Sequence, residues 1–202
     1  MALVKQIKNS KQQYGWVAIF MHWLVAVVVL GMYPLGLYIV SLGYYDSGYR
    51  IYPNIHRSIG ILLAMVILLR VAWKLLNPNP SMLARSKLER FAAHAGHTTL
   101  YLLLLTVVTS GYLLSTADGR SIRVFDWFSV PAIQALATRQ EDFWGNIHFY
   151  AATGMMILVA VHLAAAVKHH YVNRDATLKR MLGVQENTHD TEDRNNNQAN
   201  TL

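Results

Sequence analysis

Four long apolar stretches, separated by shorter polar segments, run along this 202-residue chain. They cover residues 16–40, 55–76, 91–115 and 144–171. Each is close to the roughly 20 residues that an α-helix needs to cross a bilayer. The pattern therefore predicts an all-α integral membrane protein, with four helices bundled into one domain over residues 1–185.

Two further segments have a different character. Residues 116–143 form a long polar loop with interspersed apolar side chains, among them Phe125, Trp127, Ile133 and Leu136. We expect this loop to lie on the membrane surface or to cap the bundle. Residues 186–202 are almost wholly polar and are predicted to be a disordered tail.

Basic residues are concentrated on one side of the predicted membrane. They precede the first stretch, separate the second from the third and follow the fourth, whereas the two other loops carry fewer and mix them with acidic residues. By the positive-inside rule, the N and C termini are both expected to be cytoplasmic. This placement accounts for the net charge of +7 without invoking nucleic acid as a partner.

Composition narrows the chemistry. Hydrophobic residues make up 53% of the chain and charged residues only 14%, against about a quarter charged in soluble domains. There is no cysteine, which excludes disulfides, iron–sulfur clusters, thiolate-ligated haem and covalent c-type haem. Any bound metal must be held by histidine, methionine or carboxylate groups.

Histidines supply the candidate ligands. His148 and His162 are fourteen residues apart on one helix (162 − 148), a rise of roughly 21 Å and close to four turns. They therefore share a face at two depths. His56 begins the second stretch at the outer depth, and His22 lies near the inner end of the first. We pair His56 with His148 as an outer site and His22 with His162 as an inner site.

Two imidazoles at one depth fit the axial positions of a haem b, whose porphyrin supplies the other four nitrogens. Zinc fits less well, because it takes three or four protein ligands. A membrane histidine can also serve as a proton relay or an interhelical hydrogen-bonding group. A haem-free transporter or proton channel is therefore an alternative function.

Other residues compete for roles at these sites. His94 and His97 lie on one face of the third stretch near its inner end, where they could ligate, contact a propionate or bind a quinone. Arg57 could pair with a propionate or remain solvated. Arg70 has the same two options, with snorkelling to the interface favoured. His169 and His170 end the fourth stretch and suit interfacial anchoring.

Small residues recur at matching heights. Gly36 follows His22 by fourteen residues, Gly111 follows His97 by fourteen, and Gly60 is one turn after His56. Glycine lets a flat macrocycle approach the backbone, but it equally allows ordinary packing between membrane helices.

Four ordered motifs resemble the prokaryotic cytochrome b561 family. They are His22-Trp23, the run Asn54 to Gly60, the run Ala93 to His97, and the run His162 to Tyr171. The similarity covers roughly residues 14–182. It implies a bacterial inner-membrane cytochrome with two b haems, whose iron ligands match His22, His56, His148 and His162. It leaves His94, His97, Arg57 and His169 as residues that support a haem or contact a quinone.

The same resemblance implies electron transfer between the quinone pool and a donor or acceptor at the outer face. One branch of the family is a superoxide oxidase that reduces ubiquinone, and related cytochromes anchor hydrogenases. Expected partners are therefore membrane lipid, a quinone, and either superoxide or a redox protein. The small-residue faces are also compatible with a homodimer. The rival assignments are a haem-bearing anchor subunit of a larger redox enzyme and the haem-free transporter.

Overall fold

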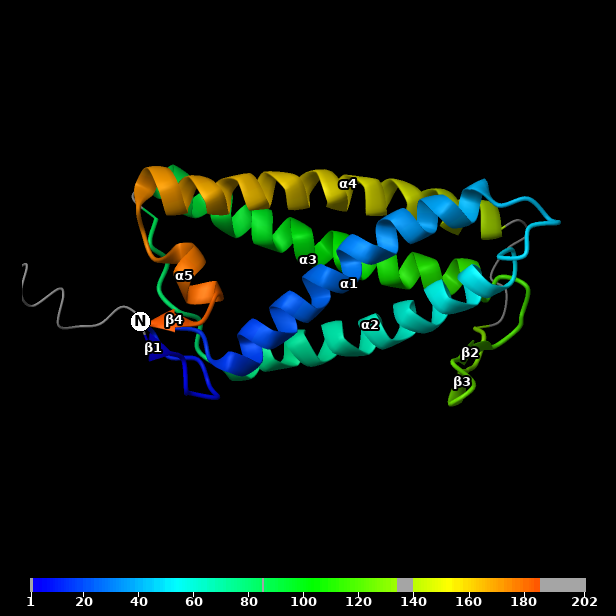
Figure 1. Ribbon diagram of the computed structural model, residues 1–202, viewed down its shortest axis with the longest axis horizontal. Coiled ribbons are helices and arrows are strands. Elements are labelled where there is room, and N and C mark those ends of the chain that lie inside the picture. The colour runs from blue at the N-terminus through cyan, green and yellow to red at the C-terminus, as the bar shows by residue number, and fades with distance from the viewer. Residues whose placement is uncertain (1, 85, 134–139, 186–202) are drawn as a thin grey trace, which may run out of the picture.

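Four long helices run side by side in the computed structural model, which describes residues 2–84, 86–133 and 140–185 (Figure 1). All four are long and apolar enough to cross a membrane. No more than 11% of the most apolar window of each helix is buried within the molecule, so most of their apolar surface faces outward. The predicted helices are confirmed as α1 (Trp16–Ser41), α2 (Ile51–Leu76), α3 (Lys87–Ser115) and α4 (Gln140–Lys168).

Three of these helices begin four residues before the apolar stretch that predicted them. The added turns are polar or interfacial, so hydropathy alone does not reveal them. In α3 the start is set by capping, because the Ser86 hydroxyl accepts a hydrogen bond of 3.1 Å from the Glu89 backbone N–H. Such a cap satisfies one of the free N–H groups of the first turn.

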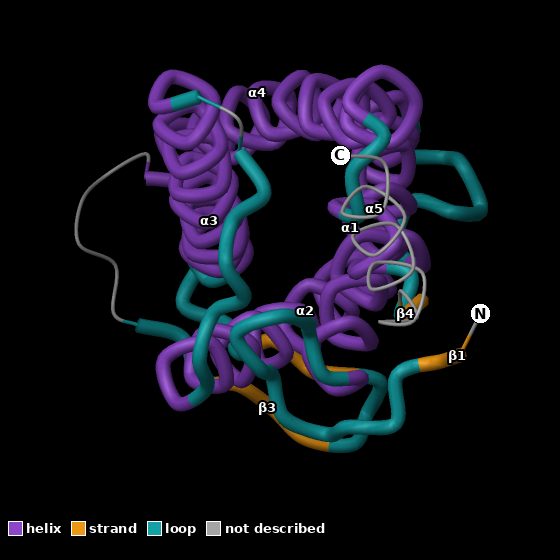
Figure 2. The backbone as a smooth tube through the Cα atoms, turned by 90° about the vertical axis from the view of Figure 1, so that its left-hand side faces the viewer, coloured by secondary structure: helices purple, strands orange, loops and turns teal. Residues whose placement is uncertain are grey.

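Each helix neighbours the next one along the chain, and α4 closes the ring against α1. The view along the bundle shows the four helices surrounding a common centre (Figure 2). The closest packing is between α3 and α4. The order around the ring places α2 diagonally opposite α4, so that side chains from these two helices meet only across the centre.

An apolar layer crosses the middle of the bundle. Its buried members come from all four helices: Val25, Val29, Leu63, Ile67, Leu104 and Met155. Four of them lie seven residues after a membrane histidine, since 29 − 22, 63 − 56, 104 − 97 and 155 − 148 are all seven. Two helical turns place this layer midway between the two histidine depths.

Both ends of the described chain meet at one end of the bundle, which we call the inner end. The short strands β1 (Ala2–Leu3) and β4 (Val184–Gln185) pair there in antiparallel fashion. After α4 come a π-helical turn, η1 (His169–Asn173), and a short helix, α5 (Thr177–Met181). The Trp23 indole N–H of α1 donates to the Met181 carbonyl at 2.8 Å. The C-terminal segment is thereby tied to α1.

The opposite, outer end carries a hairpin of β2 (Ile122–Val124) and β3 (Phe128–Val130). It forms part of the long loop predicted to lie on the surface. The strand side chains Ile122 and Val124 are buried, whereas Trp127 at the turn is 73% exposed. Leu136 and the predicted polar tail lie outside the described residues.

Candidate functional site

Each helix contributes two positions fourteen residues apart, which form an inner and an outer level. The inner positions are His22, Arg70, His97 and His162, and the outer positions are Gly36, His56, Gly111 and His148. The apolar layer lies between the two levels. Every residue of this set lies in one of the four membrane-crossing helices.

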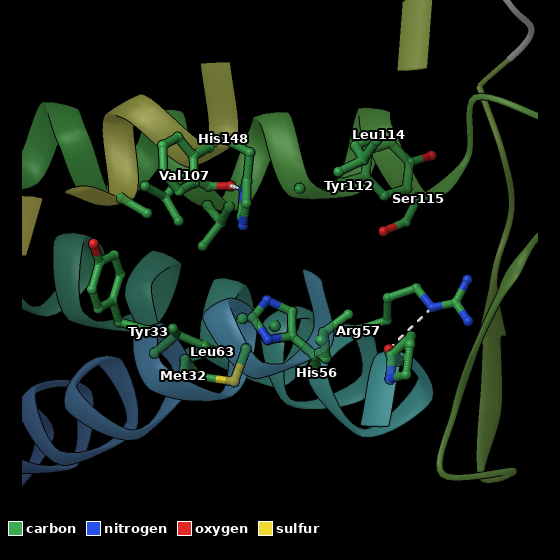
Figure 3. Close-up of a pocket in the computed structure, with 18 of the residues that line it drawn as sticks. Met32, Tyr33, His56, Arg57, Leu63, Val107, Tyr112, Leu114, Ser115 and His148 are labelled. Atoms are coloured by element: carbon green, nitrogen blue, oxygen red, sulfur yellow. Dashed lines mark hydrogen bonds between the residues drawn. The ribbon is translucent and has the colours of Figure 1, made fainter. Parts of the chain in front are cut away.

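At the outer level His56 and His148 come together across the bundle diagonal. Their ring centres are 6.1 Å apart and their planes cross at 76°. Metal–imidazole bonds are about 2 Å long, so two rings on opposite sides of one iron have centres about 6 Å apart. Figure 3 shows the two rings approaching one cavity from opposite walls.

That cavity has a volume of about 510 Å³ and draws its lining from all four helices. The value lies within the usual range for cofactor sites, roughly 300–1,000 Å³. Leu63, Leu104 and Met155 of the apolar layer form part of its lining. Gly36, Gly60 and Gly111 also line it. The cavity is therefore an apolar space with two imidazoles and few other polar groups.

Helix α3 holds the His148 ring from behind. The Nδ1–H of His148 donates to the Val107 carbonyl at 2.9 Å, and the Ser110 hydroxyl lies 3.4 Å from the same nitrogen. A Cβ at Gly111 would come within 2.9 Å of the ring. With Nδ1 as the donor, Nε2 carries the free lone pair that a metal requires.

The His56 ring has a looser environment. Its Nδ1 is buried without a hydrogen-bond partner among the described residues. A Cβ at Gly36 would lie 3.4 Å from the ring, in ordinary contact. Unpaired buried polar atoms are uncommon and call for an explanation. The His56 ring lines the cavity, so a group bound there would supply the missing partner.

Arg57 lies at the mouth of the cavity. Its guanidinium donates to the Pro53 carbonyl at 3.2 Å and to the Asn54 side-chain oxygen at 2.5 Å, both on its own helix. Asp118 also lines the cavity, and Arg120 binds its carboxylate. The side-chain hydrogen bond from Arg120 is the main reason why the pKa of Asp118 is lowered.

At the inner level Arg70 turns into the bundle and does not snorkel. Its Nη2 lies 3.0 Å from Nδ1 of His22, and its Nε donates to the Tyr101 hydroxyl at 3.1 Å. The remaining nitrogen, Nη1, is buried with no partner among the described residues. Lys74 adds a second cation, 4.4 Å from the centre of the Tyr101 ring.

The other two inner histidines contact each other. The rings of His97 and His162 have centres 5.3 Å apart and cross at 66°. His22 lies close enough to both for electrostatic interaction. The structure thus gathers three histidines at this level and includes His97 beside the predicted pair. His94 is exposed on the same helix.

His169 is surrounded by carboxylates at the inner end. Its Nδ1 lies 2.6 Å from Asp175, and its Nε2 lies 3.4 Å from Glu89. Burial acts to raise the pKa of Asp175, but hydrogen bonds from His169 and Thr177 outweigh it and lower that pKa. The sequence pattern did not predict that Asp175 and Glu89 contact His169. The capped acidic first turn of α3 was the available signal for Glu89.

The described residues contain no cluster of three or more histidine, cysteine or acidic side chains placed to hold a metal ion. A zinc site made by protein alone requires three or four such ligands. The paired imidazoles of the outer level instead match a group that brings four equatorial donors of its own. The residues present therefore fit a haem b.

Comparison with known proteins supports this interpretation. The family model described as prokaryotic cytochrome b561 matches residues 13–184. Cytochrome b561 homolog 2 of Escherichia coli is 49% identical over 176 residues, which are 87% of this chain and 94% of that protein. A probable superoxide oxidase, CybB of Yersinia pestis, is 28% identical over 85% of this chain and 96% of its own. Cytochrome b561 homolog 1 of Escherichia coli is 26% identical over 81% and 93%.

Proposed function

The chain belongs to the prokaryotic cytochrome b561 family and is thus a multi-pass membrane cytochrome of the haem b type, and we propose that it holds two haems that carry electrons between the quinone pool and a donor or acceptor at the outer face. The observation that carries the proposal is the facing pair His56 and His148, with ring centres 6.1 Å apart across a cavity of about 510 Å³.

His56 and His148 would hold the outer haem. His148 is oriented by its hydrogen bond to the Val107 carbonyl, which leaves Nε2 free. Gly60 leaves space on the α2 wall, because a Cβ there would come no closer than 3.9 Å to the tip of Met32. Because the cavity is apolar, it would also exclude water from the haem faces, and solvent exclusion is one means by which a protein adjusts a reduction potential.

His22 and His162 would hold the inner haem. Arginine only donates hydrogen bonds, so Nδ1 of His22 accepts from Arg70 at 3.0 Å and the ring proton lies on Nε2. Ligation through Nε2 therefore requires Arg70 to release this bond. The propionates of a haem are suitable carboxylate acceptors for Arg70, whose Nη1 has no hydrogen-bond partner among the described residues.

When bound, each haem supplies reversible one-electron transfer, and the protein supplies position and potential. Each imidazole pair would hold one haem iron and leave it no open site, so small molecules would exchange electrons at the haem edge. The apolar layer keeps the two levels apart, and α4 links them because it carries His148 and His162. Electrons would thus pass along α4 from one side of the membrane to the other.

For the outer donor we propose superoxide, since one relative is named a probable superoxide oxidase. Two superoxide anions would each give up one electron and leave as O₂. The two electrons, with two protons, would reduce one quinone to its quinol. Arg57 at the cavity mouth would attract the anion, whereas Arg120 and Arg123 are already paired with Asp118 and Asp126.

We further propose that the protein lies in the bacterial inner membrane with its inner end in the cytoplasm. Both described ends of the chain meet at this end, and the basic residues gather around it. The positive-inside rule then gives the orientation. Lipid surrounds the outward apolar faces of the four helices, and these faces also leave room for a second copy of the chain.

The ligand assignment can be tested by substitution. His56→Ala and His148→Ala should each remove one haem, the same one, and leave the other with its spectrum unchanged. The exposed His94 provides a matched control, because His94→Ala should retain both haems. Retention of two unchanged haems in the His148→Ala variant would refute the outer site. Reduction of added quinone by pulsed superoxide would then separate an oxidase from an anchor subunit, which would fail to turn over alone.

A further inference from the structure

We propose that α3 controls the outer haem, although this helix supplies neither of its proposed ligands. Gly111 and the Val107 carbonyl, both on α3, set the position and basicity of His148. This inference rests on the proposed function, in which His148 ligates iron. It concerns a positioning device, since Gly111 and Val107 act through the imidazole.

The first observation is the absence of space behind the ring. A Cβ added at Gly111 would lie 2.9 Å from Cε1 and 3.0 Å from Nδ1 of His148. Neither separation leaves room for a methyl group without a shift of the ring. The position opposite, Gly36, is looser, with 3.4 Å to His56. Of these two glycines, only Gly111 closes the space behind an imidazole ring. We call this space, bounded by Gly111, Val107 and Ser110, the niche of His148.

The second observation is the hydrogen bond that the niche makes possible. The His148 Nδ1–H reaches the Val107 carbonyl at 2.9 Å because the ring sits directly against the backbone of α3. An axial imidazole that donates from its other nitrogen gains electron density and becomes a more basic ligand. A more basic ligand stabilises ferric iron and lowers the reduction potential.

Ser110 completes the niche. It is 1% exposed, and its hydroxyl donates to the Thr106 carbonyl at 2.6 Å, the shorter of its two carbonyl contacts. Its oxygen lone pair therefore remains available to the His148 Nδ1–H at 3.4 Å. This second, weaker acceptor would add to the effect of the Val107 carbonyl.

The two ligands of the outer haem are thus unequal. His148 has two acceptors at Nδ1, whereas Nδ1 of His56 has none among the described residues. Hydrogen-bond control of the outer potential must then act through α3 and His148. No described residue offers His56 a comparable hydrogen-bond acceptor.

The test is a Gly111→Ala variant of the full-length, haem-loaded protein, studied by redox titration and by EPR of the ferric haems. The added methyl group pushes the ring away and lengthens the bond to the Val107 carbonyl. We expect the outer potential to rise and the outer EPR signal to shift, since that signal depends on the orientation of the axial imidazoles. The inner haem should not change. Loss of the outer haem from this variant, with the inner haem retained, would also support the proposal.

Gly96→Ala is the matched control, because Gly96 lies on the same helix and a Cβ there would meet nothing within 4 Å. Gly111→Ala and Gly96→Ala variants with the same outer potential and EPR signal would overturn the inference. So would a shift confined to the inner haem. If the Gly111→Ala protein does not accumulate, Ser110→Ala decides: a raised outer potential supports the niche, and an unchanged one overturns it. A wild-type protein with no haem at all would refute the proposed function instead.

Discussion

The ring of His97 lies against the ring of His162, with centres 5.3 Å apart, at the level where His22 and Arg70 also meet. The inner level therefore holds three histidines and an arginine in place of a simple pair. His22 bonds to α2 through Arg70, and His162 contacts α3 through His97. The inner ligands are therefore drawn from three neighbouring histidines, and substitution can distinguish between them.

We predict that His22→Ala removes the inner haem and that His97→Ala retains it with a shifted spectrum, because His97 would support His162 without binding iron. Haem content per polypeptide and reduced-minus-oxidised spectra measure both outcomes. If His97→Ala loses the inner haem while His22→Ala keeps it, α3 supplies the ligand and our pairing is wrong.

Arg70 is predicted to raise the potential of the inner haem. A cation inside the bundle disfavours the additional positive charge of ferric iron. A unit charge about 10 Å away, at an effective dielectric constant near 20, contributes about 2 kcal/mol. Arg70→Gln should lower the reduction potential of the inner haem by this amount. Arg70→Lys keeps the positive charge and should retain most of the wild-type potential. Redox titration of both haems measures the change.

Arg90→Gln is the control for this charge effect. Arg90 is exposed near the start of α3, where water and salt screen it. Its removal should leave both potentials close to their wild-type values. Equal shifts in the Arg70→Gln and Arg90→Gln variants would show that Arg70 has no specific role.

Ser58 is predicted to hold the outer hairpin to α2. Its buried hydroxyl donates to the Arg123 carbonyl at 3.3 Å and accepts from the Phe125 N–H at 3.2 Å. Ser58→Ala removes both bonds and should weaken docking by about 1–2 kcal/mol. Trypsin cleavage after Arg123 should then accelerate by roughly tenfold. Ser41→Ala, which removes only a local bond to Tyr38, should cleave at the wild-type rate.

Acid should loosen the segment that follows α4. The pKa of Asp175 in the folded protein is below its ordinary value of 3.8, so its stabilising effect is complete well above pH 3.8. The effect is lost as the pH falls through the lower, folded-state pKa. Hydrogen exchange in residues 169–182 should therefore accelerate below about pH 4.

Asp175→Asn should exchange several-fold faster already at neutral pH and lose the acid dependence, because the charge-assisted contact with His169 is absent. Asp142→Asn, on the first turn of α4 at the far end of the helix, should leave this segment unchanged. Identical exchange of the segment in the wild-type and Asp175→Asn proteins at neutral pH would argue against the contact.

Some features of this architecture can be predicted from the sequence and others cannot. Four apolar runs of membrane length suffice for four helices, and the rise of an α-helix alone places positions fourteen residues apart at two depths. The sequence does not predict which side chains contact one another, because these contacts depend on how each helix is rotated and tilted. Arg70 has the spacing of a snorkelling residue, yet its helix turns it toward His22. The pairing of β1 with β4 joins segments about 180 residues apart, which no local pattern reveals.

The glycines illustrate the same limit. Their regular spacing indicates close approach of something at the outer level. Only the structure shows that the His148 ring itself occupies the space at Gly111. A fourteen-residue spacing locates a level, whereas the contact that fills it follows from the packing of α3 against α4.

The central claim is that two haems occupy the two histidine levels. A reduced-minus-oxidised spectrum of the purified protein, combined with haem and protein quantitation, tests it most directly. We predict b-type α and β bands, a strong Soret band and two haems per chain, with one lost in His148→Ala and the other in His22→Ala. A colourless protein, or a single haem that is lost equally in both variants, would contradict the claim.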